Sequence, residues 1–156
     1  MKKTKRMALL AAVAAAGAWA QTSTTSTSTR DIAIAGLGAN ETAQLFVVNT
    51  ATASGGGTAA SCTGSLSYTN AAGTAIGTAV TFALGTGQSS SASLPYSQAG
   101  QSGRAIVRAH LTLTRAGGSN APCSLKTLFE TFDTTTGATH VHVDGGQQTL
   151  GGGFRD

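Results

Sequence analysis

Apolar and polar residues alternate along most of the chain after residue 30, in short runs separated by clusters of Gly, Asn and Ser. Alternation places successive side chains on opposite faces of an extended strand, and short runs divided by turn residues are typical of β-sandwiches and barrels. The pattern therefore predicts an all-β, antiparallel fold of about seven or eight strands. The expected strands lie near residues 31–36, 42–50, 60–69, 75–84, 89–95, 103–115, 123–133 and 138–144.

The alternation is clearest over residues 104–115, where small and aliphatic residues occupy every second position. Arg104, Arg108 and His110 fall on the opposite, outer face. They are a candidate cationic strip for an acidic partner, although charges on a solvated strand usually serve solubility alone. A loop containing Gly and Ser follows at residues 116–120 and predicts a hairpin to the 123–133 strand.

The 123–133 segment also has a helical pattern, because four of its apolar residues show the spacing i, i+3, i+4, i+7: Leu125, Leu128, Phe129 and Phe132. We favour a strand because residues that prefer strands predominate, and a bulge near Thr127 would reconcile the two faces. After it, Asp133 and Gly137 predict a tight turn, with the carboxylate accepting bonds from nearby backbone amides and the glycine at positive φ.

The first twenty residues have the pattern of a cleavable signal peptide. Lys2, Lys3, Lys5 and Arg6 precede ten uncharged residues, and a small-residue motif, Ala18-Trp19-Ala20, follows. A run of ten apolar residues is too short to span a bilayer, which needs about 20. The alternatives are an uncleaved anchor and a cytoplasmic helix. We expect cleavage before Gln21 and no transmembrane segment in the mature chain, which would then be secreted or periplasmic.

Beyond the signal peptide the composition predicts three parts. Residues 21–30 are rich in Ser and Thr and have no apolar face, so we expect a flexible leader, with a spacer or stalk as the alternative. Residues 31–146 form the sandwich domain, whose length suits a single core. Residues 147–156 are a Gly-rich tail.

Removing the signal peptide changes the charge of the protein. It contains four of the ten basic residues and none of the six acidic ones, so the mature chain has six of each and no formal net charge. A nucleic-acid partner normally requires a dense basic surface. The sequence therefore argues against nucleic-acid binding.

Cys62 and Cys123 are the only cysteines of the chain. Oxidising compartments favour pairing of an even number of cysteines, so we expect a disulfide rather than two free thiols. Closing a loop of about 60 residues would stabilise the domain by about 4 kcal/mol in the chain-entropy model. Neither cysteine lies in a CxxC motif, which indicates a structural rather than a redox role.

Several segments resemble a family of small secreted bacterial proteins that have immunoglobulin-like sandwiches and no assigned activity. The matching segments are residues 42–49, Cys62, 85–88 with 92–94, 103–108, Cys123, and 132–133 with 136–139. The resemblance implies the same fold and export, and it carries no catalytic residues over. The chain departs from the family's pattern at Thr86, where proline is usual, and in the two histidines of the last strand.

His140, His142 and Asp144 form the one site-like motif. Alternation on a strand points all three side chains to the same side, and such nitrogen and oxygen ligands suit Zn²⁺ or Cu²⁺. If the last strands form a meander, His110 lies about 10 Å from the pair, with the 123–133 strand between them. The simpler interpretation is that Val141 and Val143 face the core while the histidines face water.

These features favour a secreted or cell-surface module without enzymatic activity, which is structural or binds an envelope or extracellular protein or glycan. The alternatives are a periplasmic metal-binding protein that uses the HxHxD strand, and a secreted hydrolase. The hydrolase is disfavoured because the chain lacks the GxSxG motif that exposes a nucleophilic serine. No catalytic residue and no resident cofactor are predicted.

Overall fold

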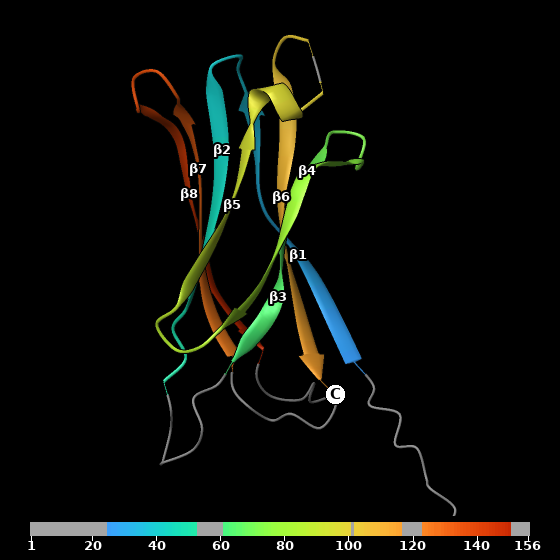
Figure 1. The fold of residues 1–156 in the computed structure, drawn as a ribbon, viewed down its shortest axis with the longest axis vertical. Coiled ribbons are helices and arrows are strands. Elements are labelled where there is room, and N and C mark those ends of the chain that lie inside the picture. Colours follow the sequence, from blue (N-terminus) through green and yellow to red (C-terminus); the bar gives the residue numbers. More distant parts are fainter. Residues whose placement is uncertain (1–24, 53–60, 101, 117–122, 151–156) are drawn as a thin grey trace, which may run out of the picture.

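The computed structural model describes residues 25–52, 61–100, 102–116 and 123–150. Eight strands form two antiparallel four-stranded sheets (Figure 1), which confirms the predicted β-sandwich. The elements are β1 (Thr25–Leu37), β2 (Glu41–Asn49), β3 (Cys62–Asn70), β4 (Ala75–Leu84), β5 (Ser89–Pro95), the 3-10 helix η1 (Tyr96–Gln98), β6 (Ala105–Ala116), β7 (Cys123–Asp133) and β8 (Thr139–Leu150). Within the described segments, no helix is long and apolar enough to cross a membrane.

One sheet has the strand order β1-β6-β3-β4 and the other β5-β2-β7-β8. Only β3–β4 and β7–β8 are consecutive strands that pair with each other; every other connection passes from one sheet to the other. The predicted hairpin between residues 103–115 and 123–133 is therefore wrong, because β6 and β7 belong to different sheets. Turn residues indicate a reversal of the chain, and a reversal is equally compatible with a crossing between sheets.

The core lies between the inner faces of the two sheets, where alternate residues of each strand are buried. Tyr68 on β3 is almost fully buried, and its hydroxyl donates to the Ala92 carbonyl at 2.8 Å and to the Ala43 carbonyl at 3.4 Å. Burial raises the pKa of this phenol. Because Ala43 and Ala92 belong to the opposite sheet, Tyr68 connects the two layers by a hydrogen bond as well as by apolar contact.

The predicted disulfide is present. Cys62 at the start of β3 and Cys123 at the start of β7 are bonded, with Cα atoms 5.4 Å apart. Since β3 and β7 belong to different sheets, the bond joins the layers covalently. An inter-sheet disulfide across a two-layer antiparallel sandwich is an immunoglobulin-like arrangement.

The first and last strands extend beyond the predicted domain. Residues 25–30 were expected to belong to a flexible leader, but they form the first half of β1 and pair with β6 from Thr25 opposite Ala116 to Arg30 opposite Leu111. Their side chains are exposed, so backbone hydrogen bonds and the strand preference of Thr hold them rather than burial, the only term that the composition argument considered. At the other end, β8 includes residues 147–150 of the predicted tail. Residues 1–24, and with them the predicted signal peptide, lie outside the described residues.

The ambiguous 123–133 segment is a strand, β7, and its inner face comprises Cys123, Leu125, Thr127, Phe129 and Thr131. A register shift lies near Thr127, as predicted, but the extra residue belongs to β8: Lys126 pairs with Gln147 and Leu128 with Asp144. The shift does not bring the apolar residues of β7 to one face. Leu128 and Phe132 point outward while Leu125 and Phe129 point inward.

The predicted turn after β7 is confirmed. Asp133 Oδ1 accepts hydrogen bonds from the Thr135 and Thr136 amides, both at 2.8 Å, and these bonds lower the pKa of the Asp133 carboxyl. Gly137 has a φ of 72°, which a residue with a side chain rarely adopts. The turn leads directly into the strand that carries the HxHxD motif.

Candidate functional site

The outer face of the β5-β2-β7-β8 sheet is built from three cross-strand rows of side chains. The middle row contains Phe46 on β2 and Leu128 on β7, which lie opposite each other in the register. The flanking rows are polar or charged on β7, with Glu130 on one side and Lys126 on the other. This apolar row, bordered by charged side chains of β7, makes the face a candidate binding surface.

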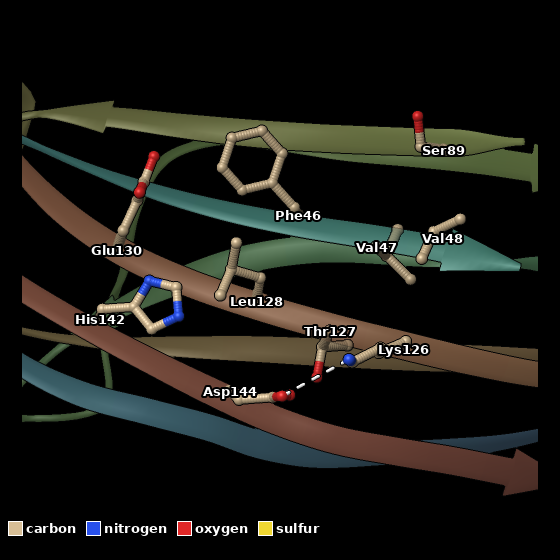
Figure 2. Close-up of a pocket in the computed structure, with 10 residues that line it drawn as sticks. All are labelled: Phe46, Val47, Val48, Ser89, Lys126, Thr127, Leu128, Glu130, His142 and Asp144. Atoms are coloured by element: carbon tan, nitrogen blue, oxygen red, sulfur yellow. Dashed lines mark ion pairs between the residues drawn. The ribbon is translucent and has the colours of Figure 1, made fainter. Parts of the chain in front are cut away.

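A groove with a volume of about 570 Å³ lies over this face. Small-molecule sites usually have volumes of about 300–1,000 Å³, apolar walls and a few placed polar groups. Figure 2 shows Phe46 and Leu128 near the centre, with Glu130 and His142 at one end and the Lys126–Asp144 pair at the other. The lining residues are Phe46, Val47, Val48, Ser89, Lys126, Thr127, Leu128, Glu130, His142 and Asp144.

Strand β8 supplies one wall of the groove, and its bulge sets the position of Asp144. Gly146 takes a φ of 69° in the bulge and its amide donates to Asp144 Oδ1 at 3.0 Å. Lys126 Nζ lies 3.6 Å from Asp144 Oδ2. The Gly146 amide and, secondarily, the Lys126 ammonium hold the pKa of this carboxyl below its usual value. At this end of the groove each charge therefore has a counter-charge.

The opposite end of the groove has no such pairing of charges among the described residues. Glu130 and His142 face each other in the β7–β8 register. Among the described residues, neither side chain makes a hydrogen bond or an ion pair, and the Glu130 side chain is only half-exposed. Glu130 is therefore a carboxylate at the rim of an apolar groove without a protein partner in the described part of the chain.

The structure places His140, His142 and Asp144 on the outer face of β8, with Val141 and Val143 packed against the core, as the alternation predicts. The three side chains have different surroundings. His140 Nδ1 bonds Glu41 Oε1, His142 lines the groove, and Asp144 pairs with Lys126. Within the ranges that the structure describes, no three His, Cys, Asp or Glu side chains gather as a metal-ligand set.

Glu41, at the start of β2, has a side chain that is only 14% exposed. It accepts hydrogen bonds from the His140 imidazole and from the Gly38 amide. The His140 bond first and the Gly38 amide second lower the pKa of the Glu41 carboxyl. This pair closes the β1–β2 turn against β8 and lies outside the set of groove-lining residues.

His110 does not lie near the other histidines. The expected meander is wrong because β6 and β8 belong to different sheets, so His110 projects from one outer face of the sandwich and His142 from the other. The alternation correctly placed both side chains outward, but it contains no information about which sheet each strand joins. A site shared by His110 and the HxHxD strand is excluded.

The candidate cationic strip is interrupted. Arg104 precedes β6, is exposed, and reaches the Gly36 carbonyl at 3.5 Å, whereas Arg108 is half-buried. His110 has a side chain only 14% exposed and is hydrogen-bonded on both ring nitrogens. Beside Arg104 and Arg108, Ile34 and Ile106 are the large apolar side chains that remain exposed in the described segments.

The hydrogen bonds of His110 connect a carboxylate, an imidazole and a hydroxyl. Asp31 Oδ1 lies 2.7 Å from Nδ1, and Thr69 Oγ1 lies 2.7 Å from Nε2. This connectivity is that of a hydrolase triad, but β6 and β3 are interior strands of their sheet. Their backbone N–H groups are used in the sheet ladders, whereas an oxyanion hole needs free donors. These contacts instead provide a hydrogen-bond partner for each ring nitrogen of the half-buried His110.

Most groove residues were not identified from the sequence, which indicated only His142 and Asp144. A signal was present in strand β2, where Leu45-Phe46-Val47-Val48 is apolar at four consecutive positions and thus on both faces. The ambiguous spacing in β7 has the same origin, since Leu128 adds an outward apolar residue to a strand whose inner face is already apolar.

No protein-family model, curated protein or solved structure matches the chain.

Proposed function

We propose that this protein is an exported β-sandwich module without enzymatic activity that binds a partner through the groove on the β5-β2-β7-β8 face. The observation that carries the proposal is the groove itself, with the half-buried side chains of Phe46 and Leu128 at its centre and charged side chains at both ends. A groove with apolar walls and a few placed polar groups is the usual form of a ligand site. The partner belongs to the envelope or the extracellular medium.

Export is supported by the signal-peptide pattern of residues 1–20 and by the Cys62–Cys123 bond, which suits an oxidising compartment. The intact mass of the protein recovered from the producing cell tests this part of the proposal. We expect a chain that begins at Gln21 and is two hydrogen atoms lighter than the reduced form. Recovery of the full-length chain with free thiols would contradict export.

Partner binding is tested with a photo-crosslinking phenylalanine analogue at position 46, in the protein as the cell exports it. We expect ultraviolet light to give a discrete adduct with a protein or glycan. The matched control carries the same analogue at Thr112, on the outer face of the opposite sheet, and we expect no such adduct. Leu128→Lys should remove the position-46 adduct, because it puts a positive charge at the centre of the apolar row. Equal adducts from both positions, or none from position 46, would reject the groove as the binding site.

A further inference from the structure

We infer that the ligand of this groove is an organic cation with an apolar body, supplied by a partner protein as a basic side chain flanked by apolar residues. The inference rests on the proposed function and names the chemistry of the partner. It follows from three features of the groove: its apolar centre, the carboxylate at one end, and the ion pair at the other.

The centre of the groove fits an apolar body. Phe46 and Leu128 are cross-strand neighbours, and Val48 continues the apolar surface along β2. Each of these side chains is half-buried by its neighbours in the sheet and keeps one side open to the groove. Covering this surface removes apolar area from water, and the gain is independent of the ligand's charge.

The Glu130 end fits a positive charge. The Glu130 carboxylate has no hydrogen-bond or ion-pair partner among the described residues, and Figure 2 shows Phe46 and His142 as its neighbours in the groove. A cation at this position would meet both a carboxylate and an aromatic ring, and both attract positive charge. A neutral ligand would leave the carboxylate partly dehydrated and unpaired, which is unfavourable.

The opposite end does not favour an anion. Lys126 is the one basic side chain among the lining residues apart from His142, and it already has Asp144 as its counter-charge at 3.6 Å. Apart from His142, the lining residues carry two carboxylates and one ammonium. An anionic ligand would share Lys126 with Asp144 and would meet the fields of both Asp144 and Glu130. The groove therefore selects for positive charge.

Three probes of similar size and different charge test the inference: 2-phenylethylammonium, 2-phenylethanol and 3-phenylpropanoate. Each is titrated into the ¹⁵N-labelled exported protein, and the backbone amide shifts of Phe46, Leu128, Glu130 and His142 are followed. We expect the ammonium to bind at least about five-fold more tightly than the alcohol, and the carboxylate to bind most weakly. Added salt should reduce the preference, because exposed charges are screened.

The variant Glu130→Gln keeps the shape of the side chain and removes its charge, so the ammonium and the alcohol should then bind equally. Asp31→Asn, on the outer face of the other sheet, removes one negative charge elsewhere and should leave the preference unchanged. A preference that survives Glu130→Gln, or that falls equally in both variants, would overturn the role assigned to Glu130. Dispersed amide spectra confirm that each variant is folded.

The outcomes separate this inference from the proposed function. Equal binding of the ammonium and the alcohol at the groove would overturn the cation inference and leave partner binding supported. The same holds if no probe shifts the groove amides while the position-46 crosslinker still forms its adduct. If neither probes nor crosslinker report binding at the groove, both proposals are wrong.

Discussion

The two outer faces of the sandwich differ although both sheets contribute the same kind of inner face. On the β1-β6-β3-β4 face, side chains satisfy one another: the Thr29 and Thr112 hydroxyls lie 2.9 Å apart, and His110 is bonded to Asp31 and Thr69. On the β5-β2-β7-β8 face, an apolar row is open to solvent and Glu130 has no partner in the described part of the chain. The first face therefore pairs these polar groups within the protein, with Ile34 and Ile106 exposed beside them, whereas the groove on the second face leaves the Glu130 carboxylate for a ligand.

The largest expected effect is on stability, and it separates the inner from the outer side of β7. Phe129 is fully buried and Leu128 lines the groove, so Phe129→Ala should lower the free energy of unfolding by about 3–5 kcal/mol and Leu128→Ala by about 1 kcal/mol. Denaturant unfolding measures both. If the two losses were equal, the two sides of the strand would not differ in burial and the groove would be part of the core.

Removal of the disulfide tests the covalent connection between the layers. The double variant Cys62→Ala, Cys123→Ala should lose about 4 kcal/mol, because the bond closes a loop of 61 residues in the unfolded chain. Thermal and denaturant unfolding of the variant and of the oxidised protein give the difference. A loss below about 1 kcal/mol would mean that packing alone holds the sheets together.

Tyr68→Phe tests the hydrogen bond between the layers. The substitution keeps the ring but removes a donor from the Ala92 carbonyl, and it should cost about 1–2 kcal/mol. Tyr96→Phe is the matched control, since the Tyr96 hydroxyl bonds the Gly103 carbonyl at an exposed position. We expect a smaller loss there because water replaces the lost donor. The reverse order in denaturant unfolding would count against the buried bond.

The stability of the groove-bearing sheet should depend on pH through Glu41. The folded state lowers the pKa of this carboxyl below its ordinary value of 4.5, because His140 and the Gly38 amide bond its ionised form. Glu41 therefore stabilises the fold above pH 4.5, and this contribution is lost as the pH falls through the folded-state pKa. Glu41→Gln should flatten the dependence of unfolding free energy on pH in this acidic range. An unchanged slope in the variant would contradict the assignment.

The smallest expected effect on stability is at the outer face of the β1-β6-β3-β4 sheet. Thr112→Val removes a hydroxyl whose partner, Thr29, is exposed and can bond water instead, so the unfolding free energy should change by less than about 0.5 kcal/mol. Probe binding at the groove should not change. An altered probe affinity in this variant would show that the two outer faces are coupled.

Alternation predicted where the strands lie because period-two burial is a local property. The predicted range for β5 coincides with the observed strand, and those for β2 and β6 differ by one or two residues. The prediction of a flexible leader was wrong at residues 25–30. Backbone hydrogen bonds to β6 order this segment, although its polar side chains bury no apolar surface. The outward direction of His110, His140 and His142 was also predictable, but their grouping was not.

Residue types and spacing alone determined the all-β class, the pairing of the two cysteines, and the Asp133–Gly137 turn. The tertiary structure decided which strands share a sheet, because hydrogen bonds between strands depend on partners far apart in the chain. It therefore decided that His110 lies on the opposite side of the protein from His142. It also decided that Phe46, Leu128 and Glu130 meet in one groove, since no local pattern relates β2 to β7.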